Sequence, residues 1–162
     1  LKSGADKVAL NTQLHENPNL INEISKNFGS QCIVVQIDAK KIKDNHWEPY
    51  TRGGRDRTFK NMVEWAIEAQ DRGAGEIYLT SIDNEGTRKG LDLSIHKKLK
   101  EILTIPLIYC GGVGKIDHIL NAYKKYQFDG ISLSFLLHID NKSISEIKKE
   151  LIKNKVNISL RK

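Results

Sequence analysis

The stretch EIYLTSIDNEGTRKG, residues 76–90, decides the fold, because a short apolar strand runs directly into a polar loop that carries glycine. Residues 59–72 before it have helical periodicity, and Gly73 supplies a stop. After it, Asp92 can cap a second helix whose apolar residues share one face. The predicted unit is therefore helix, strand, loop and helix.

This unit recurs along the chain. Apolar strands are predicted at residues 7–10, 32–37, 76–80, 106–110 and 130–133, and helices at about 17–27, 59–72, 92–102, 115–125 and 143–151. Between them, residues 40–57 suggest a hairpin-like excursion. Because each strand is almost entirely apolar, the pattern predicts an α/β fold with a parallel sheet covered on both faces. Such units fit either an open doubly wound sheet or part of a (β/α)₈ barrel.

The composition is that of an ordinary single domain spanning residues 1–162. No apolar run approaches the roughly 20 residues of a membrane span, and no secretory signal is visible, so we expect a cytoplasmic protein without membrane attachment. The net charge of +6 arises largely from lysines spread over helix faces, which favours a solvated surface over nucleic-acid binding. We expect Cys32 and Cys110 to be buried, reduced thiols.

One carboxylate is the sharpest candidate for chemistry. Asp38 directly follows an apolar strand, which would place it at the mouth of the sheet, where a general acid or base can act. A structural Asp that accepts backbone hydrogen bonds in the following loop is an equally good interpretation. The five histidines show neither metal-ligand spacing nor a Ser-His-Asp order, so we expect no metal and no cofactor.

Two glycine loops and one polar pair follow other strands. Gly111 and Gly112 precede a predicted helix, where glycine lets backbone N–H groups approach an anion. A tight turn without a ligand is the commoner meaning of such a motif, but Gly86 follows the preceding strand and points to the same rim. Asn11 and Thr12 form a second rim pair. Anion sites at two places would suit a substrate with two phosphates.

Segments in order along nearly the whole chain resemble the cyclase subunit of imidazole glycerol phosphate synthase. They are GADKV (4–8), NT (11–12), FGSQ (28–31), IDAK (37–40), GAGEI (73–77), LTSID (79–83), GGVG (111–114) and FLLH (135–138). The resemblance implies a (β/α)₈ TIM barrel, of which this chain would contain the fourth strand onward. A complete barrel needs about 250 residues, so we expect the chain to be part of a longer protein.

The resemblance also implies an activity. Ammonia from a partner glutaminase subunit would react with a bis-phosphorylated ribulosyl formimino carboxamide ribonucleotide. The products would be imidazole glycerol phosphate and an aminoimidazole carboxamide ribonucleotide, a lyase-type step of histidine biosynthesis. Asp38 matches one of two acid–base carboxylates, and the other would precede this chain, so we expect the chain alone to be inactive.

Further residues are assigned by the same resemblance. Asn11 and Thr12 match one phosphate site, and Gly86, Gly111, Gly112 and Ser134 match the second. Lys7 and Glu76 begin strands, where charge is usually a solvated ion pair, but they match the entrance for ammonia from a glutaminase at the amino ends of the strands. Gln31 and Thr80 would face the barrel interior.

Three departures from the family pattern touch the second phosphate region. Glu85 replaces the usual Asp, Tyr109-Cys110 replaces a small residue and Ser, and Phe135 replaces Ser, which removes a hydroxyl donor. The pattern therefore also resembles paralogues that deliver ammonia for amidation of a surface-polysaccharide sugar. A non-catalytic module that docks a glutaminase is a third hypothesis.

Overall fold

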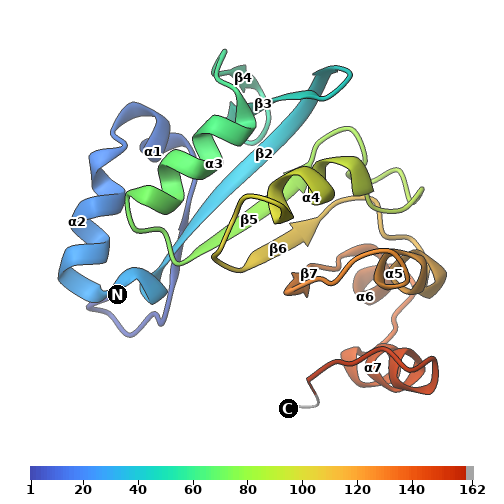
Figure 1. Ribbon diagram of the computed structural model, residues 1–162. Helices are drawn as coiled ribbons and strands as arrows, with labels where there is room; N and C mark the ends of the chain where they lie inside the picture. The colour runs from blue at the N-terminus through green and yellow to red at the C-terminus, as the bar shows by residue number, and fades with distance from the viewer. Residues whose placement is uncertain (160–162) are drawn as a thin grey trace.

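The computed structural model describes residues 1–159 and contains one seven-stranded sheet (Figure 1). Five strands are parallel and adjacent in chain order: β1 (Val8–Leu10), β2 (Ile33–Lys43), β5 (Glu76–Ser81), β6 (Leu107–Cys110) and β7 (Gly130–Ile131). A doubly wound sheet reverses its strand order at a switch point, and this order never reverses. The chain therefore forms an arc of a (β/α)₈ barrel.

The described residues form seven α-helices, of which the five predicted ones agree with their ranges to within a few residues at each end. They are α1 (Thr12–Glu16), α2 (Asn19–Phe28), α3 (Met62–Asp71), α4 (Leu93–Lys100), α5 (Ile116–Tyr123), α6 (Phe135–His138) and α7 (Ile144–Lys153). Caps fix the starts of three of them: Asn61 for α3, Asp92 for α4, and Ser143 with Glu146 in a capping box for α7. The short helices α1 and α6 were not predicted. Within residues 1–159, no helix is both long and apolar enough to cross a bilayer.

The two faces of the sheet have different surroundings. On β5, Ile77, Leu79 and Ser81 are almost fully buried, whereas Tyr78 and Thr80, which point the other way, are half-buried. We call the first face helix-covered, since α1 to α4 pack on it around the main core, and the second face open. The expectation of cover on both faces is wrong for the described residues, because α1 to α4 lie on one face of the sheet (Figure 1) and the other face borders a hollow.

The hairpin-like excursion is confirmed and changes how Asp38 is presented. β2 continues past Asp38 and turns back as β3 (His46–Thr51), which pairs with it antiparallel and then with β4 (Asp56–Arg57). The sequence predicts that Asp38 follows the end of its strand. In the structure it lies within the strand, opposite Tyr50 on one side and Thr80 on the other. It still lies near the edge of the parallel sheet, because its parallel partner β5 ends just beyond this level.

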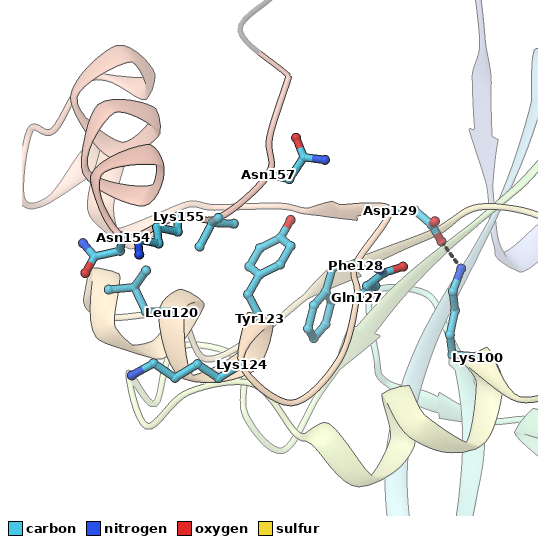
Figure 2. A pocket seen from close by; sticks show the side chains of 11 residues that line it. Lys100, Leu120, Tyr123, Lys124, Gln127, Phe128, Asp129, Asn154, Lys155 and Asn157 are labelled. Atoms are coloured by element: carbon cyan, nitrogen blue, oxygen red, sulfur yellow. Dashed lines mark hydrogen bonds and ion pairs between the residues drawn. The ribbon is translucent and has the colours of Figure 1, made fainter.

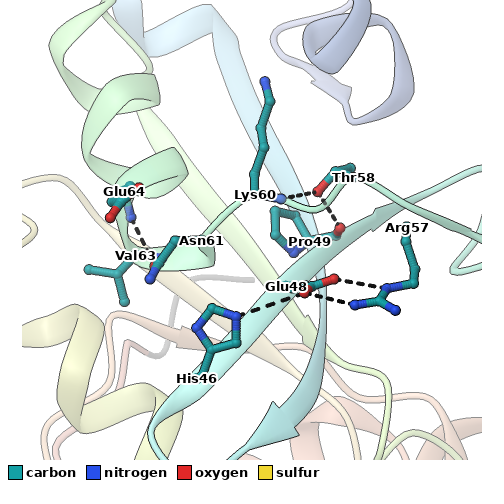
Figure 3. Close-up of polar contacts among 9 residues, drawn as sticks. All are labelled: His46, Glu48, Pro49, Arg57, Thr58, Lys60, Asn61, Val63 and Glu64. Atoms are coloured by element: carbon teal, nitrogen blue, oxygen red, sulfur yellow. Dashed lines mark hydrogen bonds and ion pairs between the residues drawn. The ribbon is translucent and has the colours of Figure 1, made fainter.

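One buried carboxylate fixes the base of the hairpin (Figure 3). Glu48 accepts two hydrogen bonds from the Arg57 guanidinium, at 3.0 and 2.9 Å, and His46 approaches it at 3.8 Å. The hydrogen bonds from Arg57 lower the pKa of the Glu48 carboxyl. The Thr58 hydroxyl donates to the Pro49 carbonyl at 2.7 Å, which joins β3 to the segment before α3. These contacts hold β3 of the hairpin beside Asp38.

The two cysteines differ from the expectation in burial. Both thiols are free, but Cys32 and Cys110 are only partly buried. Cys32 lies in a short 3-10 turn before β2, because Gly29 ends α2 there.

Candidate functional site

Most of the predicted site residues lie along one edge of the sheet, where its parallel strands end. Asp38 is in register with Thr80, and Thr80 with Cys110, which Gly111 and Gly112 follow. Neighbouring strands are about 4.8 Å apart, so the level of Asp38 on β2 is roughly 10 Å from the glycine loop after β6. Asn11, which follows β1, reaches the same edge and contacts Asp38.

The Asp38 carboxylate is held at both oxygens. It is 7% exposed, and its Oδ2 accepts a hydrogen bond from Asn11 Nδ2 at 3.1 Å, while Oδ1 accepts one from Gln36 Nε2 at 3.1 Å. These donors are side-chain amides, so the alternative of backbone hydrogen bonds from the following loop is not what the described residues show. Asp38 borders a hollow of about 530 Å³ on the open face, together with Tyr78 and Thr80. Thr80 therefore lies where it was predicted.

The polar pair after β1 is already engaged within the protein. Asn11 Nδ2 also donates to the Tyr50 carbonyl at 3.0 Å, so both of its side-chain N–H groups have partners. Its Oδ1 is buried without a hydrogen-bond partner among the described residues. The Thr12 hydroxyl accepts from the Arg52 backbone N–H at 3.0 Å. A phosphate at this pair could thus receive hydrogen bonds from the Thr12 hydroxyl and from backbone N–H groups, and the site stays a prediction.

The residues of the second predicted phosphate site lie together in space. A hollow of about 180 Å³ is lined by all four of its residues, Gly86, Gly111, Gly112 and Ser134, along with Arg88 and His138. The loops after β5 and β6 are joined by a hydrogen bond from Gly90 N–H to the Gly112 carbonyl, at 2.8 Å. Gly112 has φ +90°, and a Cβ there would lie 2.2 Å from the Gly90 carbonyl oxygen. Glycine is therefore required for this approach of the two loops.

Arg88 and His138 are the residues that the sequence reasoning missed. The Arg88 guanidinium lies 4.9 Å from the centre of the Phe135 ring, so the aromatic side chain that replaces a hydroxyl supports a cation instead. The available signal was the position of Arg88 in the loop, two residues beyond Gly86. The Glu85 carboxylate lines the same hollow.

Two side chains separate the hollows and belong to both. Glu85 and Cys110 line the hollow beside Asp38 and the glycine hollow alike. The Cys110 thiol donates to Glu85 Oε2 at 3.8 Å, and burial raises the pKa of this thiol. The two hollows are therefore neighbours along one rim. Within residues 1–159, no group of His, Cys, Asp and Glu side chains has the arrangement of a metal site.

Charged residues lie at the opposite ends of the strands. Lys7, just before β1, forms an ion pair with Glu76 at the start of β5, so the pair spans the intervening β2. Gln31 was predicted to face the interior, but it is exposed and donates to the Phe28 carbonyl at 3.2 Å. That prediction is wrong, because the turn after Gly29 directs the side chain back onto the end of α2.

The largest of these hollows, about 580 Å³, contains none of the predicted residues (Figure 2). It lies at the amino end of β7, where Asp129 accepts from Lys100 Nζ at 2.6 Å and from the Leu107 backbone N–H at 2.9 Å. Tyr123 and Phe128 form one side of it. Its volume does not make it the site, since the rim with Asp38 is at the other end of the strands.

Comparisons with known proteins agree with this arrangement. The family described as "Histidine biosynthesis protein" matches residues 1–142. A protein of Flavobacterium johnsoniae named "Imidazole glycerol phosphate synthase subunit HisF" is 42% identical over 160 residues, which are 99% of this chain and 63% of that protein. Proteins with the same name from Prochlorococcus marinus subsp. pastoris and a Hydrogenobaculum species are 42% and 41% identical over 160 residues, with 98% and 99% of this chain and 63% and 64% of those proteins covered.

The chain thus spans less than two thirds of the length of these relatives, and the match extends over almost all of the chain itself. The matched region includes β1 to β7 and both hollows of the rim. The fold and the arrangement of the rim agree with the family match. The chain belongs to the histidine biosynthesis protein family.

Proposed function

We propose that the protein containing this chain is an ammonia-dependent cyclase of histidine biosynthesis, acting in the cytoplasm. Its substrate is a bis-phosphorylated ribulosyl formimino carboxamide ribonucleotide. It forms imidazole glycerol phosphate and an aminoimidazole carboxamide ribonucleotide. The names of the curated relatives and the family membership support this proposal.

In this proposal Asp38 transfers protons during ring closure. Its carboxylate borders the hollow of the open face and is fixed by two amide donors, which suits a general acid–base group that must meet one atom of a substrate. A second carboxylate would come from a strand outside this chain.

The glycine hollow would bind one phosphate of the substrate. Gly86, Gly111 and Gly112 leave room for an anion beside the backbone, and Arg88 supplies a positive charge. The other phosphate would bind near Asn11 and Thr12. Ammonia would enter past Lys7 and Glu76 from a glutaminase docked at the amino ends of the strands.

One observation carries the proposal: Glu85 and Cys110 line both the hollow beside Asp38 and the glycine hollow. A single substrate held by its phosphate in one hollow can therefore extend directly to Asp38 in the other. An acid–base group and an anion site at unrelated places would not support cyclisation of one molecule.

Replacement of Asp38 tests the proposal in the intact protein. Asp38→Asn keeps the shape and should lower ammonia-dependent turnover by roughly 10²- to 10⁴-fold, the usual contribution of a general acid–base group. Calorimetry should show bis-phosphate binding largely unchanged. The matched control is Asp71→Asn, at an exposed position of α3. Near-normal turnover of Asp38→Asn would remove this residue from the mechanism.

A second candidate rests on Phe135 and Glu85. The Phe135 ring lies against Arg88, and Glu85 places a negative charge beside the glycines, so the second hollow differs from a purely phosphate-binding one. This favours delivery of ammonia to a sugar acid for surface-polysaccharide amidation. Titration of the intact protein with the bis-phosphate distinguishes the two: absence of binding, with glutaminase affinity retained, would favour this candidate or a non-catalytic docking module. Amidation of a sugar acid then separates these last two.

A further inference from the structure

A polar layer crosses the open face between Asp38 and the Lys7–Glu76 ion pair. Gln36 on β2 is in register with Tyr78 on β5, one level below the Asp38–Thr80 pair. The Tyr78 hydroxyl donates to Ser132 Oγ at 2.8 Å, and burial raises the pKa of Tyr78 to about 12. This layer is thus uncharged but rich in hydrogen-bonding groups, in contrast to the charged level beneath it.

Gln36 is the unexpected member of this layer. It interrupts the run IVVQI, in which Ile33, Val35 and Ile37 are fully buried on the other face. Side chains in the middle of a parallel strand are ordinarily apolar, and a polar group that is withdrawn from water costs free energy unless it forms a hydrogen bond. The contact that satisfies Gln36 is therefore informative about why it is present.

That contact is with Asp38. Gln36 and Asp38 are two residues apart on one strand, so both side chains point to the open face, and Gln36 Nε2 lies 3.1 Å from Asp38 Oδ1. Asn11 holds the other oxygen from the neighbouring strand end. With one amide at each oxygen, the plane of the carboxylate is fixed in a single orientation at the border of the hollow. Loss of either amide leaves one oxygen free to rotate away.

We propose that Gln36 is a positioning residue for Asp38: it fixes the orientation of the carboxylate toward the hollow of the open face. This inference deepens the proposed function, and the effect expected on catalysis rests on that proposed function. Gln36 also lines this hollow, and the role proposed for it acts through Asp38. Gln36 differs in this from Asn11, which also donates to the Tyr50 carbonyl and so joins the end of β1 to the hairpin. The Gln36 side chain has no other hydrogen-bond partner among the described residues.

The kinetic test uses Gln36→Met in the intact protein, because Met has the same length without the amide. A lost hydrogen bond to a charged group and a misaligned acid–base group predict a fall in kcat of about 10- to 100-fold. KM for the bis-phosphate should stay nearly constant, since Gln36 does not line the glycine hollow that would hold a phosphate. Gln13→Met, an exposed position of α1, is the control for the substitution itself. An unchanged kcat in Gln36→Met would overturn the proposal.

A second measurement does not depend on turnover. The ¹³C resonance of the Asp38 carboxyl carbon, assigned by its loss in Asp38→Asn, should shift in Gln36→Met and in Gln36→Leu but not in Gln13→Met. An unshifted resonance would overturn the proposal whatever the kinetics. If the wild-type protein shows no ammonia-dependent turnover, the proposed function fails, and the carboxyl resonance alone still decides whether Gln36 positions Asp38. Two variants at position 36 guard against one that does not fold.

Discussion

The helix-covered face and the open face of the sheet are built from the same strands but contribute differently to the protein. Along β2, Val35 and Ile37 are fully buried on the helix-covered face, whereas Gln36 between them is a half-buried polar residue on the open face. The period of two along a strand therefore separates stability from chemistry. Side chains that hold the fold point to one side, and side chains that contact Asp38 point to the other.

The largest expected effect contrasts adjacent residues of β5. Leu79 is fully buried on the helix-covered face, so Leu79→Ala should lower the free energy of unfolding by about 2–5 kcal/mol. Thr80 is half-buried on the open face, and Thr80→Ala should change it by about 0.5 kcal/mol or less. Urea unfolding of both variants of the intact protein measures the difference. Equal losses would mean that the open face is packed as tightly as the other.

The same contrast explains how much of the fold could be predicted. The apolar runs and the caps at Asp92 and Ser143 are local signals, and the structure confirms the elements they predicted. Cover on both faces could not be judged, because Val34 and Ile108 are apolar although they alternate with the buried residues and so point to the open face. An apolar strand sequence predicts that its residues are shielded from water, but it does not predict which element covers them.

The candidate site was predicted to a similar extent. The glycine motifs and Ser134 line one hollow, as predicted. This could be predicted because these residues match a family pattern and act through the backbone. The contacts of Asn11 and Gln36 with Asp38 could not be predicted, since a hydrogen bond between side chains depends on strand register and rotamers. Arg88 was missed for the same reason, because its ring partner Phe135 is distant in sequence.

A smaller effect concerns pH and the helix-covered side. Burial, with a contribution from the charge of Lys60, lowers the pKa of His15 to about 4 from 6.5. The unfolded chain therefore binds a proton between these two values that the folded chain does not, so stability falls as pH drops from about 6.5 to 4. His15→Phe keeps a ring beside Trp65, 4.5 Å away in the wild type, and should flatten this dependence.

Urea midpoints measured across that pH range check this expectation. His96, on α4, and His118, on α5, also have pKa values that burial lowers, so part of the slope should persist in His15→Phe and a smaller part when His96 is replaced as well. Thr80→Ala, on the open face, should leave the slope as it is in the wild type. A slope as steep in the double replacement as in the wild type would show that His15 and His96 do not cause it.

The smallest effect on stability is expected at the far end of the open face. Lys7 and Glu76 are 46% and 21% exposed at their side chains, and solvent screens such a pair, so Lys7→Met should cost at most about 1 kcal/mol. The ion pair between Lys100 and Asp129 also lies at the amino ends of the strands and is similarly exposed, which makes Lys100→Met a matched control. Both variants should unfold at nearly the same urea concentration.

Their activities should nevertheless differ. If ammonia enters past Lys7 and Glu76, Lys7→Met should lower glutamine-dependent turnover relative to ammonia-dependent turnover, by at least about fivefold, the lower end of typical coupling between sites. Lys100→Met should leave that ratio unchanged. Equal ratios in the two variants would show that the pair is only a solvated contact. A changed ratio without a change in stability would extend the separation of the two faces to the entrance of the barrel, because a side chain on the open face would then affect function alone.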